Sequence, residues 1–222
     1  KLLSTVGRDI GLIPPIHNPQ RRAEAARSFQ RFCEIYFPMV FSLPWSDDHL
    51  KVISKIETAV REGGLFAVAM PRGSGKTSLC KAACLWAVLY GYREFVALIA
   101  ASEAHAANLL HDIKLQLETN EHLAADFPEV CIPIRALEGI ANRCKGQLYL
   151  GERTYIEWTA EKIVLPTIPG SLASGAVLMT AGLTGAIRGM THQRPDGRIV
   201  RPSLVIVDDP QTDESARSPS QC

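Results

Sequence analysis

Residues 71–78, PRGSGKTS, have the types and spacing of a loop that binds phosphate groups. The glycines at positions 73 and 75 permit the backbone angles and the close approach of amide groups that a phosphate cradle needs. The Lys76 ammonium can reach the β- and γ-phosphates of a nucleotide, and the Thr77 hydroxyl can coordinate Mg²⁺. We therefore expect ATP and Mg²⁺ to bind here. The expected nucleotide contacts are Pro71, Arg72, Gly73, Ser74, Gly75, Lys76, Thr77 and Ser78.

The usual pattern, G-x-x-x-x-G-K-[ST], begins with a glycine, but Met70 holds that position here. The change removes a turn residue and no phosphate ligand. The apolar run LFAVAM (65–70) predicts a central parallel strand that is buried on both faces. A helix is expected from about Thr77 to Tyr90, ended by Gly91. A loop between such a strand and helix directs its N–H groups at one point. The alternative is a glycine-rich turn that binds nothing.

Two carboxylates, Asp208 and Asp209, follow the apolar run LVIV near the end of the chain. A loop-bound Mg²⁺ needs a carboxylate at the end of a neighbouring strand, so Asp208 is the expected metal partner. Asp209 is then placed to polarise the attacking water. Because aspartate is one methylene shorter than glutamate, Glu214 in the sequence TDESA is a rival for that role. The alternative is a strand that ends in a solvated Asp-Asp-Pro turn.

Two arginines, Arg72 in the loop and Arg188 in GAIRG, can stabilise the negative charge that develops on the γ-phosphate. Each can instead be a structural arginine that pairs with a carboxylate. His49 begins the helix before the loop, where it can contact the adenine of a nucleotide or simply face solvent. The expected catalytic residues are Lys76, Asp209, Arg72 and Arg188, and the expected metal ligands are Thr77 and Asp208.

Further segments predict the elements that position these groups. Buried strands are expected at 94–100 and 174–182, and a hairpin is expected to turn at 160–161. Ser102 is the predicted N-cap of the helix that follows it. The alternation of buried strands and helices predicts an α/β fold with a mainly parallel central sheet flanked by helices.

The N-terminal part predicts one amphipathic helix over 21–37. Phe29, Phe32, Cys33 and Tyr36 recur on one face of it at helical spacing. Its arginines lie on the other faces, where they are solvated or contact phosphate groups. A second helix is expected to begin after Ser46, Asp47 and Asp48 and to end at Gly63 and Gly64.

The composition of the 222 residues is that of a globular protein, with 46% hydrophobic and 21% charged residues. The net charge is only +1, so any DNA contact must come from a local patch or from other subunits. The six cysteines include no C-x-x-C pair and no neighbouring histidine cluster, which argues against a zinc site and for a reducing compartment. No signal peptide or apolar run of membrane-spanning length occurs, so no membrane contact is expected. The chain starts at Lys1 and stops in a polar stretch, which suggests a piece of a longer protein.

The segments PRGSGKTS, FVALIAASEAHAANLL, GLTGAIRGM and VDDPQTDESARSPSQ together resemble the large subunit of tailed-bacteriophage terminase, a DNA-packaging motor. The resemblance spans about 41–222. It implies an ATPase domain of the additional-strand (ASCE) P-loop NTPase type over 46–222. Residues 1–45 are then an irregular segment and an amphipathic helix that pack on the core. The C-terminal nuclease domain of the family, with its acidic metal cluster, is not in this sequence, so no nuclease activity is expected from it.

By this resemblance, residues 73–77 form the Walker A loop and Asp208 is the Walker B aspartate. Asp209 stands where the family usually has a catalytic glutamate. Arg72 matches the loop arginine of the family, and Arg188 resembles an arginine that acts across a ring interface on the ATP of a neighbour. The implied activity is ATP hydrolysis that moves double-stranded DNA into a procapsid. The implied partners are other copies of the chain in a ring, the portal protein and the small terminase subunit. The implied location is the host cytoplasm, transiently at the procapsid portal.

Two other functions remain open on sequence grounds. A nucleic-acid helicase or translocase of another P-loop family shares the loop and the carboxylate strand end. Its D-E-x-[DH] signature is missing, however, because Asp208 and Asp209 are followed by Pro210 and Gln211. The third possibility is a nucleotide-dependent binding module with little turnover of its own.

Overall fold

A five-stranded mixed sheet forms the centre of the computed structural model, which describes residues 8–183, 187 and 189–210. The strand order is β4 (Glu157–Trp158), β5 (Lys162–Val164), β6 (Val177–Gly182), β1 (Phe95–Ala100) and β9 (Leu204–Asp208). The central strand β1 runs parallel to both β6 and β9. Strand β5 is antiparallel to β6 and to β4, as expected from a hairpin at 160–161. The α/β prediction is confirmed, and the sheet is parallel at its centre and antiparallel at one side.

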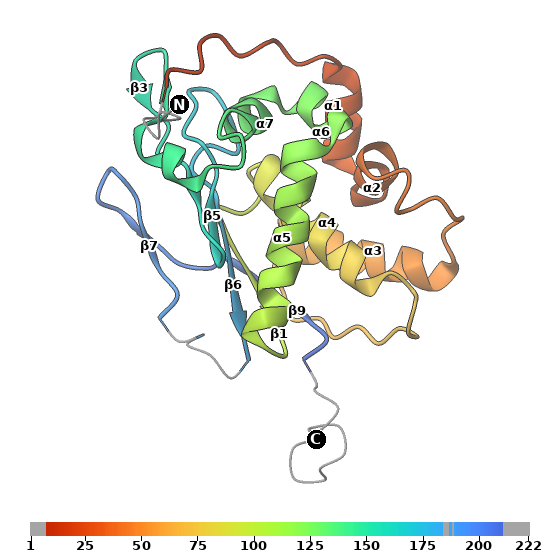
Figure 1. Ribbon diagram of the computed structural model, residues 1–222. Helices are drawn as coiled ribbons and strands as arrows, with labels where there is room; N and C mark the ends of the chain where they lie inside the picture. The colour runs from red at the N-terminus through yellow and green to blue at the C-terminus, as the bar shows by residue number, and fades with distance from the viewer. Residues whose placement is uncertain (1–7, 184–186, 188, 211–222) are drawn as a thin grey trace.

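Helices cover one face of this sheet (Figure 1). They are α1 (Pro19–Arg27), α2 (Phe29–Tyr36), α3 (Asp47–Arg61), α4 (Lys76–Leu89), α5 (Glu103–Thr119), α6 (Glu121–Asp126), α7 (Pro128–Arg135) and the 3₁₀ helix η1 (Ala141–Gly146). Side chains of β1 on this face, such as Val96 and Leu98, join the same core as α4 and α5. Within the described part of the chain, no helix is both long enough and apolar enough to cross a membrane.

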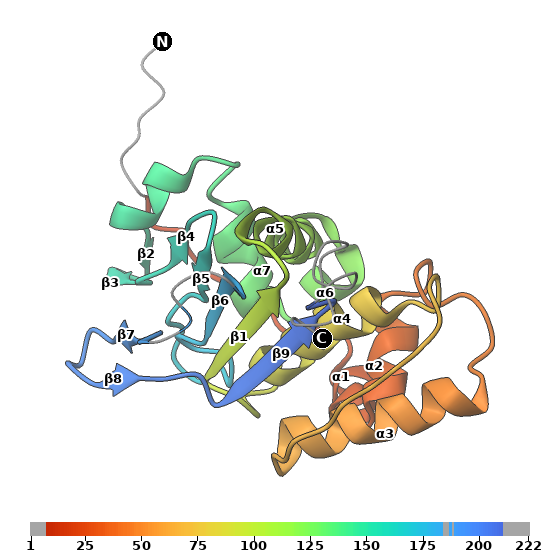
Figure 2. The ribbon, with the colours of Figure 1, turned by 90° about the horizontal axis from the view of Figure 1, so that it is seen from below.

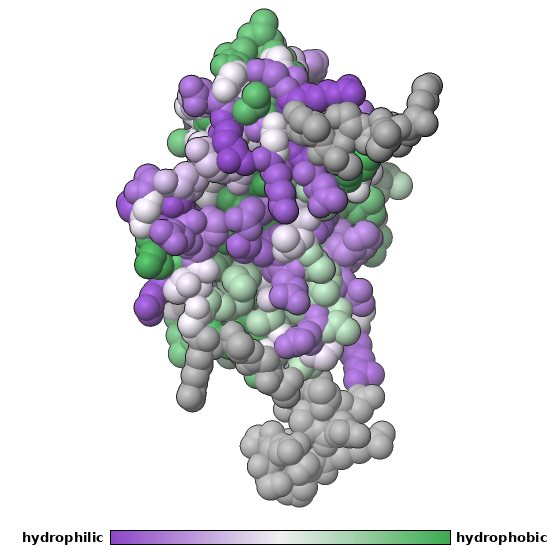
Figure 3. Space-filling model, turned by 60° about the vertical axis from the view of Figure 1, so that its left-hand side comes forward, coloured by the Kyte–Doolittle hydropathy of each residue, from purple (hydrophilic) through white to green (hydrophobic). Residues whose placement is uncertain are grey.

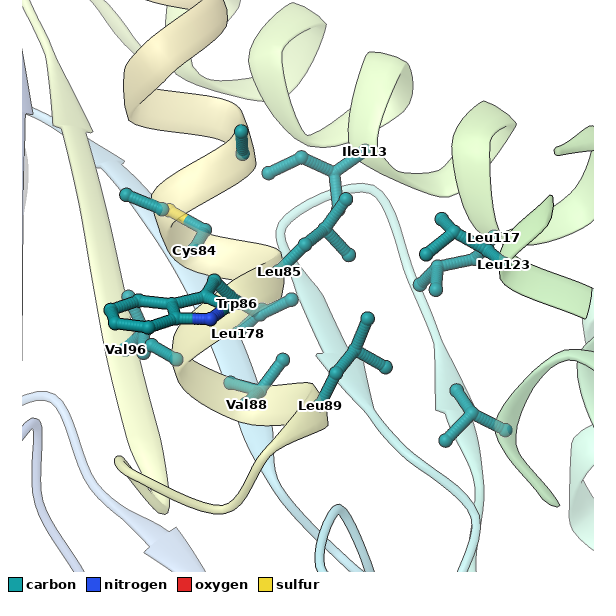
Figure 4. Close-up of a cluster of buried hydrophobic side chains, with 14 of the residues drawn as sticks. Cys84, Leu85, Trp86, Val88, Leu89, Val96, Ile113, Leu117, Leu123 and Leu178 are labelled. Atoms are coloured by element: carbon teal, nitrogen blue, oxygen red, sulfur yellow. The ribbon is translucent and has the colours of Figure 1, made fainter. Parts of the chain in front are cut away.

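Helix α4 packs on β1 and β9 and also contacts α5, which itself packs on β6 and β1 (Figure 4). Trp86 is fully buried, and Leu85 of α4 extends toward Ile113 of α5. Cys84 faces the strands, where it serves as a small apolar residue. Nearly every residue from Ala82 to Leu89 is buried. The start of α4, which carries the candidate phosphate loop, therefore rests on a rigid core.

The opposite face of the sheet is covered mainly by a hairpin of β7 (His192–Gln193) and β8 (Ile199–Val200). Phe95, Ala97 and Val177 form a smaller core there with Met190. A further two-stranded sheet consists of β2 (Leu148–Tyr149) and β3 (Glu152–Arg153). On the side of the hairpin, hydrophilic residues dominate the upper half of the surface, and a partly apolar area lies below them (Figure 3).

The helix predicted over 21–37 is in fact two helices. Ser28 has extended backbone angles (φ −140°, ψ 123°) and ends α1, while its hydroxyl accepts a hydrogen bond from Arg31 N to cap α2. A serine competes for backbone hydrogen bonds in this way, which periodicity alone does not reveal. The predicted apolar face is confirmed, because Phe29, Phe32, Cys33 and Tyr36 are fully buried.

The N-terminal arginines bind acidic residues of the protein itself. Arg21 forms a bidentate pair with the fully buried Asp126, with contacts of 2.7 and 2.8 Å. The Tyr36 hydroxyl donates to the same carboxylate at 2.9 Å. Burial raises the pKa of Tyr36, so its phenol stays protonated as this donor. Arg22 pairs with Glu129 at 2.7 Å. These contacts make α1 and α2 part of the same core as α6 and α7.

Replacing Asp126 by alanine should lower the free energy of unfolding by about 3–5 kcal/mol, because Arg21 would lose its partner beside a buried Tyr36. Urea denaturation followed by circular dichroism measures this change. Asp112→Ala is the matched control. It breaks the half-exposed pair with Lys81 and should cost less than about 1 kcal/mol. Equal losses in the two variants would contradict this account of the N-terminal anchor.

The prediction for LFAVAM (65–70) is wrong. This segment is a coil between α3 and α4, beside the sheet and outside it (Figure 2). Leu65 is fully exposed, and Phe66 and Val68 are about 40% exposed. A strand needs a hydrogen-bonded neighbour, and none of the described residues forms a β-pair with 65–70. The nearest candidate strand, β9, is an edge strand in which Val205 and Val207 are about half exposed.

Candidate functional site

The first turn of α4 lacks the cap that most helices of this chain have. The N-caps Asn18, Ser28, Ser46, Ser102 and Asn120 each accept a first-turn N–H of the following helix through a side chain. The N-cap of α4 is Gly75, and no side chain accepts there. The first N–H groups of a helix have no partner within it, and they carry the positive end of the helix dipole. The start of α4 is therefore suited to bind an anion.

The two loop glycines are required by their backbone angles. Gly73 and Gly75 both have φ +77°, in the left-handed region. A Cβ added at either position would meet no atom within 4 Å, so crowding does not explain these glycines. An L-residue in this conformation costs about 1–2 kcal/mol. The prediction that Gly73 and Gly75 adopt backbone angles open mainly to glycine is confirmed. Their role in binding phosphate stays a prediction.

Lys76 lies at the helix start and turns back over the loop. Its Nζ donates to the carbonyl oxygen of Met70 at 2.7 Å. Met70, which replaces the usual first glycine, thus contacts Lys76 through its backbone carbonyl. This contact does not depend on the Met70 side chain. Ser74 closes the turn, because its hydroxyl donates to the Pro71 carbonyl at 2.7 Å. The loop is compact although no strand precedes it.

Asp208 ends strand β9 and lies beside α4. It is 4% exposed, and its Oδ2 is buried without a hydrogen-bond partner among the described residues. Burial raises the pKa of the Cys80 thiol to about 12, and the negative charge of Asp208 and a hydrogen bond to it add to this rise. Cys80 is one helical turn after Lys76, so the structure brings the Asp208 carboxylate to the start of α4. A buried carboxylate oxygen without a partner is costly in free energy, and it indicates a missing cation or donor at Oδ2.

The oxygen donors at this place fit Mg²⁺ better than a transition metal. Thr77 offers a hydroxyl and Asp208 a carboxylate, which are hard ligands. The described residues contain no group of three or more His, Cys, Asp or Glu side chains that could hold a metal. An ion with few protein ligands that keeps water and takes phosphate oxygens is typical of Mg²⁺.

The neighbouring Asp209 has an unusual backbone. Its φ is +42°, and its side chain is exposed. Aspartate tolerates the left-handed region better than most residues, yet the conformation costs free energy. It turns the chain sharply after the buried Asp208, which leaves the second carboxylate in solvent at the same strand end. Its rival Glu214 lies outside the described residues.

The two candidate arginines differ in what the structure shows. Arg72 is exposed, and none of the ion pairs among the described residues includes it. No ion pair among the described residues therefore supports a structural role for Arg72 in the loop. Arg188 lies outside the residues that the structure describes.

A hollow of about 450 Å³ lies elsewhere, and sequence reasoning missed it. Ser174 and Gly175 line it just before β6, at the opposite end of that strand from the register of Asp208. Glu157 and the buried His192 face one another across 4.0 Å. Burial, with the positive charge of Lys162, lowers the pKa of His192. Four separate segments, around 155–157, 164–167, 174–175 and 192–196, meet there, and no spacing in the sequence links them.

Comparison of the chain with protein-family models, with curated proteins and with solved structures finds no match to any of them.

Proposed function

We propose that this chain is the ATPase motor domain of a viral terminase large subunit, a P-loop domain of the ASCE type. One observation carries the catalytic part of the proposal. An uncapped helix start that follows two left-handed glycines lies beside a buried carboxylate with an unpartnered oxygen. Phosphate and a divalent cation are the ligands that satisfy both groups at once.

The roles of the residues follow from their chemistry. The N–H groups of 73–77 and the Lys76 ammonium bind the β- and γ-phosphates of ATP. Thr77 Oγ1 and the Asp208 carboxylate would hold Mg²⁺, and the ion would supply positive charge beside the phosphate oxygens. Asp209 accepts a proton from the attacking water, with Glu214 as the rival. Arg72 or Arg188 stabilises the charge of the transition state.

The motor part of the proposal rests on the resemblance of the four segments. It adds double-stranded DNA as the substrate that is moved, and a ring of identical chains as the working form. The portal protein and the small terminase subunit are the proposed partners, and the host cytoplasm at the procapsid is the proposed place of action. Within the ring, Arg188 is the arginine that would act on the ATP of a neighbour, and the exposed Arg72 would act on the ATP of its own subunit.

The proposal predicts slow Mg²⁺-dependent ATP hydrolysis by the isolated chain and faster hydrolysis when double-stranded DNA is added. The reason for slow basal turnover is that an arginine supplied by a neighbour needs an assembled ring. Steady-state phosphate release with and without EDTA and blunt duplex DNA measures both effects.

Two outcomes would favour the alternatives. Displacement of a strand from forked duplex DNA would indicate a helicase. Tight ATP binding with no turnover, with or without DNA, would indicate a nucleotide-dependent binding module.

A further inference from the structure

The imidazole of His49 contacts the candidate nucleotide loop. His49 lies in the first turn of α3, and its Nε2 is 2.9 Å from the carbonyl oxygen of Ser74. Its Nδ1 is 2.6 Å from Ser46 Oγ. A carbonyl only accepts, so Nε2 is assigned the proton and donates to Ser74 O. Nδ1 shares its hydrogen bond with the Ser46 hydroxyl, which can donate or accept.

The hydrogen bond from His49 differs from the other hydrogen bonds of the loop, because it comes from outside the loop and α4. The remaining hydrogen bonds of 71–75 among the described residues are local, from Ser74 to Pro71 and within α4. His49 supplies the one hydrogen bond to these loop residues that comes from another element of the described chain. Among the described residues, one side chain therefore provides the hydrogen bond between residues 71–75 and another element.

His49 is itself held on a rigid support. Its backbone N–H donates to the N-cap Ser46, and the ring of Trp45 lies 5.8 Å from its own. Trp45 packs on Phe41 with ring centroids 5.2 Å apart and donates to Glu34 at 2.8 Å. The support is made before any nucleotide binds, which is what a positioning group needs.

The bond sets the direction of the peptide between Ser74 and Gly75. This peptide is trans, so its C=O and N–H point in opposite directions. While Ser74 O is held against α3, the Gly75 N–H points away from α3, as one more donor next to the first turn of α4. The reversed peptide would present a carbonyl oxygen to a phosphate and repel it.

We propose that His49 is a positioning residue, which fixes the Ser74–Gly75 peptide so that its N–H is available to the phosphate. The identity of the bound anion rests on the proposed function above. The ordering of the loop by His49 does not, because it can be measured without nucleotide.

Tryptic cleavage after Arg72 reports on the order of the loop, because Arg72 is exposed and a protease needs a loosened chain. We expect His49→Ala to raise the rate of this cleavage about 3- to 10-fold, the worth of one net hydrogen bond. His49→Gln keeps a side-chain N–H donor and should stay close to the wild type. Asp48→Ala, an exposed neighbour in the same turn, is the control and should cleave like the wild type.

Mass spectrometry of the fragments separates the possible results. Equal cleavage rates after Arg72 in the wild type and in His49→Ala would overturn the proposal. A parallel rise of cleavage after Lys51 and Lys55 would also overturn it, because the variant would then have unravelled α3 and not the loop.

Nucleotide binding gives the second readout. We expect His49→Ala to raise the Kd and the KM for Mg-ATP about 3- to 10-fold and to leave kcat within about twofold, because the amide binds ground state and transition state alike. If Lys76→Ala binds Mg-ATP as tightly as the wild type, the proposed function fails. If binding depends on Lys76 and is unchanged in His49→Ala, the proposed function stands and the positioning role of His49 is wrong.

Discussion

Lys76→Ala should lower the rate of Mg-ATP hydrolysis by roughly 100-fold or more. Lys76 is the cation at the start of α4, where its Nζ donates to the Met70 carbonyl, and under the proposed function it would bind the phosphates beside the uncapped N–H groups. Removing one preorganised donor to a developing negative charge typically costs two to three orders of magnitude in turnover. Phosphate release at saturating ATP measures the loss, and equilibrium binding shows how much of it is affinity.

Lys81→Ala is the matched control for this variant. It lies on the same helix, where its ammonium pairs with Asp112 at 2.6 Å. It should hydrolyse ATP at a rate within about twofold of the wild type, because surface ion pairs contribute little. Retained hydrolysis in Lys76→Ala, or an equal loss in Lys81→Ala, would remove the loop from the catalytic site.

Asp208→Asn should abolish Mg²⁺-dependent turnover without destabilising the fold. The substitution keeps the shape of the side chain and removes the charge that, under the proposed function, would hold the cation. A buried polar atom without a partner costs about 1–3 kcal/mol, and the Oδ2 of Asp208 is such an atom. We therefore expect the nucleotide-free variant to have an unchanged or higher free energy of unfolding, which urea denaturation measures together with the ATPase rate.

Stability and ATPase rate measured together separate a functional role of Asp208 from a structural one. A residue that only supports the strand end would lose stability and activity together when it is changed. Asp112→Asn is the control for the loss of one negative charge near α4, and it should keep turnover within about twofold. A large loss of stability in Asp208→Asn would contradict a functional reason for the buried carboxylate.

Capping residues made the helices predictable. Ser46 and Ser102 begin α3 and α5 as expected, and α4 ends before Gly91, whose φ is +68°. These signals are local, because each depends on a side chain that contacts its own backbone. The hairpin at 160–161 was predictable because its two strand-like runs follow one another directly in the sequence.

Segments 65–70 and 204–208 show where local reasoning fails. Both are continuous apolar runs, which indicate a strand buried on both faces. Strand β9 forms because it pairs with the parallel edge of β1, whereas 65–70 does not pair with the open outer edge of β9. Pairing is a property of two segments, so hydrophobicity in one segment cannot predict it.

The residue types of the candidate site were predictable from the sequence. The contacts that hold the loop in position were not. The glycines at 73 and 75, Lys76 and Asp208 carry signals of type and spacing. The hydrogen bond from His49 to Ser74 joins residues 25 apart, and nothing in their spacing predicts it. The role of Arg72 stays a prediction, because the structure shows only that its side chain is exposed and forms no ion pair within the described chain.

A structure of the chain with Mg²⁺ and a non-hydrolysable ATP analogue tests the central claim most directly. We predict that the γ-phosphate lies at the N–H groups of 73–77 with the Lys76 ammonium beside it. The metal should bind Thr77 Oγ1, and Asp208 should face it directly or through water. A nucleotide bound elsewhere, for instance in the hollow beside His192, or an Asp208 that faces away from the metal, would contradict the account.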